Sequence, residues 1–573
     1  MRRAPWVHMG IAAGLSLAFT AVLLLTSAPL GYARDEGFYF QAASSYEQWF
    51  SILLQEPGAA LQRHVVDRYW SVNSEHPAFM KSLFALSHHF LFEKWGVFST
   101  PGISFRFPAM LLSGLGVGFL YLWGSETVGG AAALVAALLF AVMPHVFHHA
   151  HLACFDMPVA ALSLFTAYAY WKSLRRGSFA GMLCVGLLYG LFLNTKHNSW
   201  LFPFAALAHS LCLNHRALFA IFVGAFASWG AYPKAKLERI SGQIWPWRFP
   251  PALLGILLIG PLVFFLTWPW IWFETVPRLR AYAAFHLGHV YYNMEFLGQT
   301  YWKPPMPHGY AWVMTLGTVP LVTLTLFTVG LVVFFVRQWP ARGSKLFGAS
   351  ARLARIPMGS PRSAVVLWIL SVLVNYAPWW SSDTPIFGGT KHWLTAYPFM
   401  CLVAGVGVRK VLALATRAEV RPIHYWARAA SLSLFILVGP FVMTWHSFPF
   451  GLSAYTPLVG GASGAANLGL NRTFWGYTSA SLFEPMNRLA PPSARVYVHD
   501  TALQSWDMHW KDGQLRRDLF GTLNIARSDL ALFHHEPHMQ RVEYQIWSAY
   551  GTAQPTDIIL FDGVPVVWLY KRP

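Results

Sequence analysis

Charged residues are scarce in this sequence. Of its 573 residues only 12% are Asp, Glu, Lys or Arg, whereas 55% are hydrophobic. A soluble globular protein carries about 25% charged residues, so this composition excludes an ordinary soluble fold for most of the chain. The apolar residues come in runs of roughly the 20 residues that an α-helix needs to cross a bilayer. We therefore predict an all-α, polytopic membrane protein.

Acidic residues are scarcer than basic ones, at 24 against 42, and the net charge is +18. In a soluble protein such a surplus would suggest a nucleic-acid partner. The part from Ser447 to Pro573, however, holds ten basic and ten acidic residues, so the surplus belongs to the apolar part. There it reports the orientation of loops rather than a partner, and we expect no nucleic acid.

Cysteine is also rare. The four thiols have neither paired nor metal-like spacing and all lie in or beside apolar runs: Cys154, Cys184, Cys212 and Cys401. They are typical of small buried hydrophobic residues and predict no metal site.

The apolar runs predict about eleven spans. They cover Val7–Leu30, Phe105–Trp123, Ala131–Val146, Met157–Trp171, Phe179–Leu193, Trp200–Leu213, Pro251–Thr267, Ala311–Val336, Ala364–Trp379, Trp393–Val408 and Ala429–Thr444. Residues Ala217–Tyr232 are apolar but short and have basic residues on both sides, so we expect them to lie on or dip into the membrane.

Basic residues orient these spans. The chain starts with Arg2 and Arg3, a basic cluster follows Trp171, and the loop from Arg337 to Arg362 holds six basic residues and no acid. Basic loops stay in the cytoplasm, which predicts a cytoplasmic N-terminus, external connections at 31–104 and 268–310, and an extracytoplasmic C-terminus. The first connection includes a clear interfacial amphipathic helix, Pro77–Trp95.

Residues 447–573 differ in character from residues 1–446. Short strand-like runs at Arg495–His499, Leu530–Phe533 and Val566–Tyr570 alternate with helical or irregular sequence. This pattern predicts a small extracytoplasmic α/β domain. It has no phosphate-binding loop or nucleophile motif, so we expect a supporting or acceptor-guiding role.

Two adjacent carboxylates, Asp35 and Glu36, directly follow the first span. Charge at a membrane border is costly unless it has a partner or a function. The simple alternative is that they are the hydrated end of a helix. Asp156 begins a later span, and the orientation argument, which used neither residue, places Asp35 and Asp156 on the same side.

The other outward-facing polar residues mix acids with Lys, Arg and His. Cations suit a phosphate head on a lipid, while a carboxylate can take a proton from an attacking hydroxyl. A proton or ion carrier would instead place its charges near the middle of its spans.

These residues occur in an ordered set of motifs. They are Asp35-Glu36, Asn73 to Pro77 followed by Lys81, Arg106 in Phe105–Pro108, Asp156-Met157-Pro158, and Gly389 to His392. In this order the motifs resemble the GT-C membrane glycosyltransferases. The chain is most similar to glycosyltransferase family 39, which includes the protein O-mannosyltransferases and the lipid A aminoarabinose transferases.

The resemblance implies inverting transfer of a sugar from a polyprenyl-phosphate donor to a hydroxyl of a protein or glycolipid acceptor. It implies Asp35 as general base, with Glu36 beside it, and Asp156 as a second carboxylate that positions the acceptor or a cation. Substrate-binding residues would be Glu75, His76, Lys81, Arg106, Lys391, His392 and, from the second external connection, His289. The aminoarabinose transferases have Lys where this chain has His76, so phosphate binding there requires a charged His76 or a substitute such as Lys81.

The resemblance also predicts a multi-pass protein of a bacterial-type inner (plasma) membrane. No cofactor is expected, although a divalent cation is compatible with the acidic pair. The histidines at 88, 89, 148, 149 and 151 suggest a metal, but we expect polar interface residues there because we find no carboxylate or Cys at ligand spacing.

Other interpretations stay open. Arg106 is also compatible with a role in neutralising a carboxylate or in reaching the membrane interface. Lys196-His197 is equally compatible with a structural role. For the whole chain, the alternatives are a lipid-linked saccharide carrier without chemistry and a noncatalytic protein that binds a polyprenyl lipid or a partner.

Overall fold

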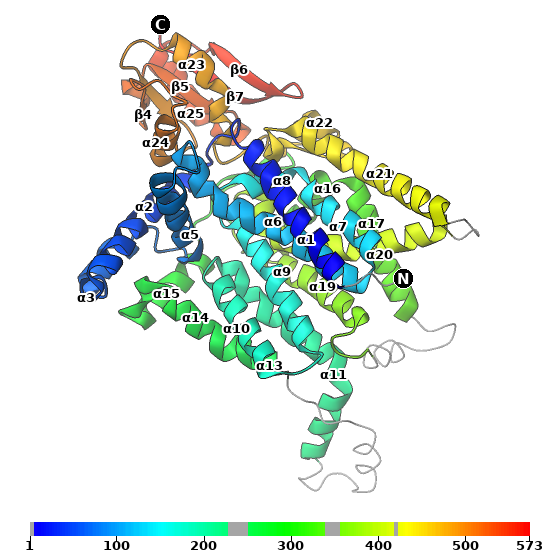
Figure 1. The fold of residues 1–573 in the computed structure, drawn as a ribbon. Helices are drawn as coiled ribbons and strands as arrows, with labels where there is room; N and C mark the ends of the chain where they lie inside the picture. Colours follow the sequence, from blue (N-terminus) through cyan, green and yellow to red (C-terminus); the bar gives the residue numbers. More distant parts are fainter. Residues whose placement is uncertain (1–4, 227–249, 339–355, 417–421) are drawn as a thin grey trace.

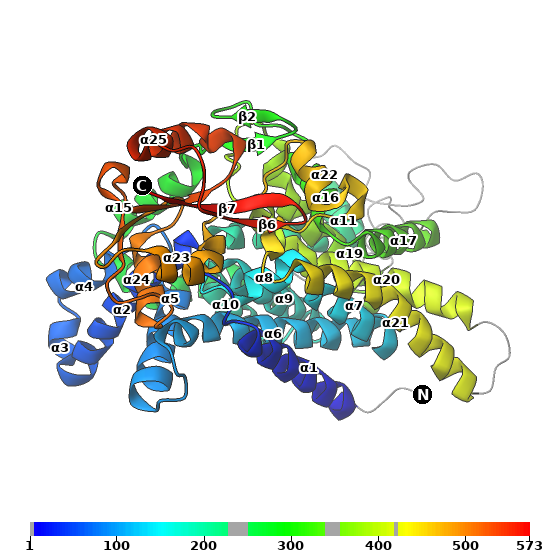
Figure 2. The ribbon, with the colours of Figure 1, turned by 90° about the horizontal axis from the view of Figure 1, so that it is seen from above.

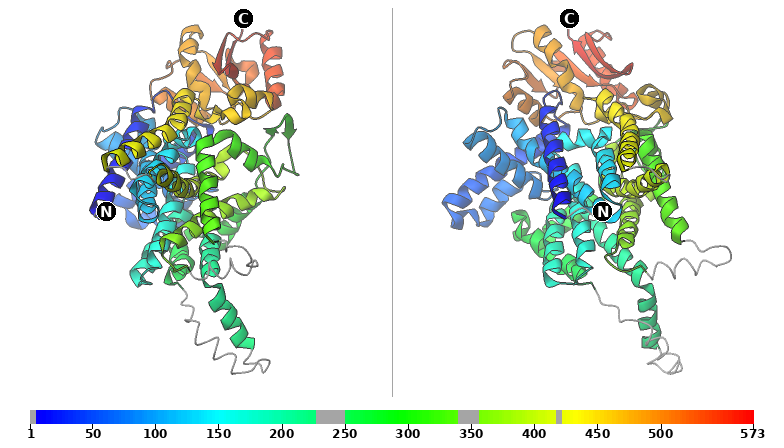
Figure 3. Two further views of the ribbon diagram at one scale, coloured as in Figure 1. Left: turned by 90° about the vertical axis from the view of Figure 1, so that its right-hand side faces the viewer. Right: turned by 45° about the vertical axis from the view of Figure 1, so that its right-hand side comes forward.

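The computed structural model describes residues 5–226, 250–338, 356–416 and 422–573. A bundle of helices makes up most of the molecule, and a small mixed α/β domain that contains the C-terminus covers one end of it (Figure 1). Both further views show the same arrangement, with α11 pointing away from the opposite end (Figure 3). The predicted fold class is thus confirmed.

Each predicted span coincides with a helix or with a broken helix. These are α1 (Pro5–Leu25), α6 (Pro101–Thr127), α7 (Gly130–Ala141) with α8 (Pro144–His151), α9 (Asp156–Ser173), α10 (Phe179–Leu193), α11 (Phe202–Phe226), α13 (Pro251–Leu254) to α14 (Gly260–Leu266), α16 (Tyr310–Thr318) with α17 (Leu321–Gln338), α19 (Pro361–Tyr376), α20 (Tyr397–Ala415) and α21 (Pro422–Ser447). Among the described residues, five helices are long and apolar enough to cross a membrane, or up to seven if each of two bent pairs is one span. This number is smaller than the predicted eleven.

Two breaks account for part of the difference. The axes of α7 and α8 differ by 68°, and those of α16 and α17 by 117°. Pro320 lies at the second break, where its missing N–H and fixed φ prevent the helix from continuing, and its carbonyl accepts a hydrogen bond from Thr323 N at 2.9 Å. The prediction of one continuous span from Ala311 to Val336 was therefore wrong.

Helix α11 corrects a second expectation. It runs without interruption from Phe202 to Phe226, so the break predicted near His215 and Arg216 is absent. The separate piece expected at Ala217–Tyr232 is thus helical and continuous with the preceding span up to Phe226, and its remaining residues lie outside the described part of the chain.

Glycines bring the bundle helices together. An added Cβ at Gly118 of α6 would lie 2.5 Å from Ala12 O of α1, and one at Gly114 would lie 2.6 Å from Ser16 O. Between α17 and α20, a Cβ at Gly407 would lie 2.2 Å from Leu326 O. Small residues at such contacts let backbones approach closely, which is how membrane helices pack where no hydrophobic force joins them.

The first predicted external connection forms a helical layer beside the bundle (Figure 1). It contains α2 (Arg34–Gln55), α3 (Pro57–Ala60), α4 (Arg63–Trp70), α5 (Phe79–Ser87) and a π-helix, His88–Lys94. The last two correspond to the amphipathic helix predicted at Pro77–Trp95. The second connection contains α15 (Thr275–Leu287) and a hairpin of β1 (Met294–Phe296) and β2 (Gln299–Tyr301).

The C-terminal domain contains a five-stranded sheet in the order β4-β3-β5-β7-β6. The strands are β3 (Arg495–Val498), β4 (Phe520–Thr522), β5 (Leu530–His534), β6 (Asp557–Phe561) and β7 (Val564–Lys571). Strand β3 pairs in parallel with β4 and with β5. Strand β7 pairs antiparallel with β5 and with β6. The three predicted strands are confirmed as β3, β5 and β7, and the view from above shows this sheet lying over the helices (Figure 2).

Helix α24 (Leu503–Lys511) joins the C-terminal domain to the start of α2. The Ser505 hydroxyl donates to Ala33 O at 2.9 Å, and Gly37 lies so close that a Cβ there would be 2.6 Å from Ser505 N. The domain thus contacts the turn of α2 that carries Asp35 and Glu36.

We expect Gly118→Ala to destabilise the protein by about 1–3 kcal/mol, the usual effect of overpacking, because α1 must move to make room. Unfolding of the detergent-solubilised protein measures this. The matched control is Gly14→Ala on α1, where nothing lies within 4 Å of an added Cβ. Equal effects of the two changes would contradict the predicted α1–α6 contact.

Candidate active site

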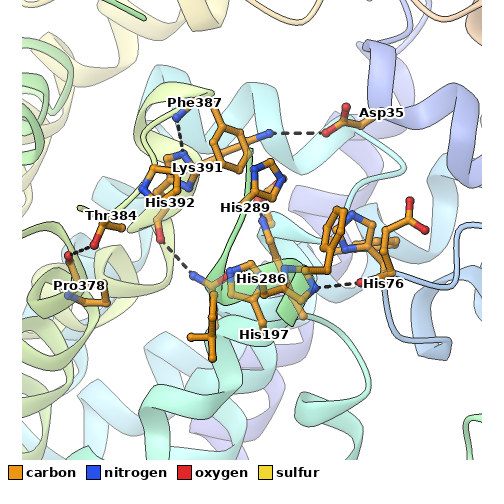
Figure 4. Close-up of a pocket in the computed structure, with 18 of the residues that line it drawn as sticks. Asp35, His76, His197, His286, His289, Pro378, Thr384, Phe387, Lys391 and His392 are labelled. Carbon is orange, nitrogen blue, oxygen red and sulfur yellow. Dashed lines mark hydrogen bonds and ion pairs between the residues drawn. The ribbon is translucent and has the colours of Figure 1, made fainter. Parts of the chain in front are cut away.

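A cavity with a volume of about 550 Å³ lies among the described residues. Its wall combines the start of α2, the turn before α5, the start of α9, the connection after α10, the end of α15, and the segment before α20. Figure 4 shows Asp35, His76, His197, His286, His289, Lys391 and His392 around it. Segments far apart in the sequence therefore contribute to one polar site.

Asp35 lies in the first turn of α2 and lines this cavity. Its Oδ2 is 3.5 Å from Lys391 Nζ and its Oδ1 is 3.7 Å from Arg34 Nε. Arg34 in turn bonds Asp500 of the C-terminal domain at 2.9 Å. The Asp35 side chain keeps 23% exposure, so it is reachable from the cavity.

Asp156 is the first residue of α9 and lines the same cavity. Its Oδ1 accepts a hydrogen bond from Lys196 Nζ at 2.5 Å, and the Asp156 side chain is only 4% exposed. Both aspartates thus sit at helix N-termini, where the helix dipole favours negative charge. The two carboxylates that the sequence predicted on one side do meet in one place.

Lys391 is the central cation of the site. Its ammonium lies 3.9 Å from the centre of the Trp475 ring and faces Asp35. Burial lowers the pKa of Lys391, and the charges of Asp35 and Asp156 oppose that effect. Gly388 has φ +88°, and a Cβ there would lie 2.3 Å from Lys391 Cε, so glycine is required for this lysine to fold over the loop.

Glu75 and His76 line the cavity from the turn before α5. Asn73, which has φ +55°, donates to Glu75 Oε1 at 2.6 Å, and His286 Nε2 donates to the Glu75 carbonyl at 2.9 Å. Burial is the main reason that the pKa of His76 lies well below its usual value. His76 lines the cavity, and its buried Nδ1 has no hydrogen-bond partner among the described residues. Its role in phosphate binding stays a prediction.

Lys81 does not line the cavity. It is fully buried, and its ammonium donates to the carbonyls of Asn73 at 2.6 Å and His76 at 2.8 Å. In this arrangement Lys81 holds the turn that carries Glu75 and His76. Its predicted contact with a donor phosphate stays a prediction.

Glu36 and Arg106 form a buried pair behind the cavity. Arg106 Nε and Nη2 donate to the two Glu36 oxygens at 2.8 and 2.7 Å, and the side chains are 2% and 0% exposed. Arg106 also donates to the carbonyls of Leu30 and Gly31. The Glu36 carboxylate further accepts from Ala33 N and Ala153 N, both at 2.8 Å. The pair therefore joins the segment before Asp35 to the segment before Asp156.

His392 and His289 both line the cavity. His392 Nε2 accepts the backbone N–H of Phe387 at 3.0 Å, and burial lowers the pKa of His392 well below its usual value. The His289 ring stacks on Phe387 at 4.2 Å between centroids. These two histidines shape the loop that carries Lys391.

Three cavity residues were missed or left open by the sequence. The sequence left Lys196 equally compatible with a structural role. The feature that could have marked it as a site residue is its predicted location on the same side of the membrane as Asp156. Arg34 and Trp475 line the cavity without any motif that marks them. Trp475 comes from the C-terminal part, so only folding brings it to Lys391.

The cavity also has a broad apolar wall. Aromatic and aliphatic side chains lie between its charged groups: Phe38, Tyr39, Phe155, Trp200, Leu201, Phe285, Leu287, Tyr292, Trp379, Phe387 and Trp475. Such a wall beside paired lysines suits an amphiphilic molecule with an anionic head.

Comparison with known proteins supports the resemblance found in the sequence. Residues 94–228 match the family model of dolichyl-phosphate-mannose-protein mannosyltransferases, a segment that contains Arg106, Asp156 and Lys196. The resemblance to GT-C glycosyltransferases of family 39 is confirmed over this segment. No curated protein matches the chain by sequence.

Solved structures that match this chain include two glycosyltransferase-related proteins, which are matched at low identity. ArnT from Cupriavidus metallidurans bound to undecaprenyl phosphate is 15% identical, with 97% of each chain covered and a TM-score of 0.43. AglB from Archaeoglobus fulgidus, an oligosaccharyltransferase in complex with an inhibitory peptide and a dolichol-phosphate, is 10% identical, with 94% of this chain and 71% of that chain covered and a TM-score of 0.46.

We expect Glu36→Gln to destabilise the protein by about 3–5 kcal/mol, because it leaves Arg106 buried with an uncompensated charge. The midpoint of unfolding measures the effect. Glu274→Gln is the control, since Glu274 is half exposed in its pair with Arg63 and such pairs add little. A Glu36→Gln protein as stable as the control would contradict this role.

Lys81 gives a pH-dependent prediction. Burial lowers its pKa to about 7 in the folded protein, whereas the unfolded chain keeps the ordinary value of about 10.4. Between these values the unfolded state binds more protons, so the contribution of Lys81 to stability rises with pH. The stability of the wild type relative to Lys81→Met should therefore increase from pH 7 to pH 10, and a constant difference would contradict the buried ammonium.

Proposed function

We propose that this protein transfers a sugar from a polyprenyl-phosphate donor to a hydroxyl of a protein or glycolipid acceptor. The observation that carries the proposal is the meeting of Asp35 and Asp156, from separate segments, in one cavity that also holds Lys391 and Lys196. The match of residues 94–228 to the mannosyltransferase family model supports the same reaction class.

Asp35 is the proposed general base. It lines the cavity and is the more exposed of the two aspartates, at 23% against 4%. A carboxylate there can accept the proton of the acceptor hydroxyl as the hydroxyl attacks the sugar. Transfer with one basic carboxylate and a phosphate leaving group gives inversion at the sugar carbon.

The cations have the complementary task. Lys391, Lys196 and Arg34 line the cavity, and charge-assisted hydrogen bonds to phosphate are among the strongest that side chains make. Each of these cations is paired with an aspartate. A bound phosphate would either join that aspartate at the cation or take its place. The apolar wall would take the first part of the lipid chain.

Glu36 has a different proposed role from the one first predicted. Its two oxygens already accept hydrogen bonds from Arg106 and two backbone N–H groups. We assign it as a positioning residue for Asp35 and Asp156, together with Arg106. Asp156 then orients Lys196 and the acceptor.

The cavity does not fit a divalent cation in its present form. Asp35 and Asp156 are each paired with a lysine, and within the described ranges the group of His and carboxylate side chains close enough to hold an ion lies elsewhere. The proposed reaction uses no cofactor. The bonds made and broken are those of the acceptor hydroxyl, the sugar and the departing phosphate.

The proposal places the protein in a bacterial-type plasma membrane, with the cavity and the C-terminal domain on the extracytoplasmic side. Residues 1–446 form the catalytic membrane domain. Residues 447–573 supply Trp475 and, through Asp500, a partner for Arg34.

Asp35→Asn should lower sugar transfer by about 10²- to 10⁴-fold, the range that a general base contributes, while insertion and unfolding temperature change little. Transfer from a polyprenyl-phosphate sugar in membranes from cells expressing the variant measures this. The control is Asp507→Asn, an exposed position on α24 outside the cavity. Retained transfer in Asp35→Asn would refute the base and favour a carrier or a binding protein.

A further inference from the structure

Two histidines and two glutamates converge on the outer layer of helices, away from the cavity. Glu47 comes from α2, and the other three come from the π-helix that follows α5. His88 Nδ1 and His89 Nδ1 lie 3.0 and 3.1 Å from the two oxygens of Glu47. The Glu93 oxygens lie 3.9 Å from His88 Nδ1 and 3.5 Å from His89 Nδ1.

This geometry matches the ligand shell of a small divalent ion. Zinc bonds to His nitrogen and carboxylate oxygen are about 2.0–2.2 Å long, so neighbouring ligand atoms in a tetrahedral site lie about 3.3–3.5 Å apart. One ligand atom each from Glu47, His89 and Glu93 already lies within 4.8 Å of the others. Only small side-chain shifts separate the observed group from that shell.

The charge balance points the same way. Among the described residues, neither Glu47 nor Glu93 has a Lys or Arg ion pair, and both face the same two imidazoles. With neutral imidazoles, two carboxylates stand together without a cation.

The backbone is specialised to make the group. A π-helix joins residues i and i+5 and is often found at functional sites, and here it spaces His88 and Glu93 by five residues, about one turn. The His88 ring stacks on Phe105, with centroids 4.4 Å apart and planes at 9°, which fixes its orientation. The expectation that His88 and His89 lack a carboxylate partner was wrong, because Glu93 follows four residues after His89 and folding adds Glu47.

We propose that Glu47, His89 and Glu93 bind one divalent transition-metal ion, with zinc preferred for this mixture of imidazole and carboxylate ligands. Glu47 lies twelve residues after Asp35 on α2, or about 18 Å along the helix axis, so the ion does not touch the reacting groups. It links two segments. One is α2, which begins with the turn that carries Asp35. The other is the π-helix after α5, and α5 follows the turn that carries Glu75 and His76.

The first test measures bound metal. The full-length protein, purified in detergent with a tag that contains no histidine, is loaded with Zn²⁺, dialysed and analysed by mass spectrometry for metal. We expect one equivalent in the wild type and at least a tenfold loss in Glu47→Gln and in His89→Gln. The matched controls, Glu56→Gln and His64→Gln, change exposed residues of the same layer and should retain the ion.

A second readout guards against misfolding of the variants. Glu93→Gln changes a half-exposed ligand and should fold, yet lose the rise in unfolding temperature that Zn²⁺ gives the wild type. Co²⁺ in the wild type should show the visible absorption of a tetrahedral site, and Glu93→Gln should weaken it. Absence of uptake in the wild type would overturn the proposal. So would uptake that persists in Glu47→Gln but disappears in Glu75→Gln, because the ion would then lie in the cavity.

Discussion

The arrangement of the site depends on the ion pair between Glu36 and Arg106. It is fully buried, and every oxygen of its carboxylate is used. A charge pair in such a place is costly unless its geometry is complete, and here it is completed by backbone groups from the chain before α2 and from the chain before α9. Asp35 follows Glu36 directly, and Asp156 follows Ala153 by three residues. One interaction therefore fixes two carboxylates that are more than a hundred residues apart in sequence.

The cavity in front of this pair holds charges that are already matched. Lys391 faces Asp35, Lys196 faces Asp156, and Arg34 faces Asp500. An anionic head that enters must compete with these carboxylates, and in doing so it would release Asp35 from its lysine beside the acceptor. In the proposed reaction, phosphate binding and preparation of the base are thus coupled. The histidines around the cavity, whose pKa values burial lowers, add hydrogen-bonding groups rather than charge.

The sequence predicted the helices, three of the five strands of the C-terminal sheet and seven of the residues that line the cavity, because apolar runs and charged motifs are local signals. It failed where the answer depends on contacts between distant segments. The break at Pro320 could have been predicted from the proline. By contrast, α11 continues through His215 and Arg216, where the basic residues had suggested the end of a span. Glu36 was predicted to act beside Asp35, but its hydrogen bonds to Arg106 and Ala153 arise only in the folded chain. The same holds for the hydrogen bonds of Lys81 to the turn that carries Glu75 and His76, and for Glu47, which reaches His88 from 41 residues away in sequence.

The proposed reaction requires Lys391 and Lys196 to bind the phosphate of a polyprenyl lipid beside Asp35. The most direct measurement is an experimental structure of the full-length protein in lipid nanodiscs with polyprenyl phosphate added. We expect density for the phosphate in the cavity, within about 4 Å of the ammonium of Lys391 or Lys196, with the carboxylate of Asp35 free to face the acceptor. Phosphate bound away from this cavity, or Asp35 and Asp156 facing separate spaces, would contradict it.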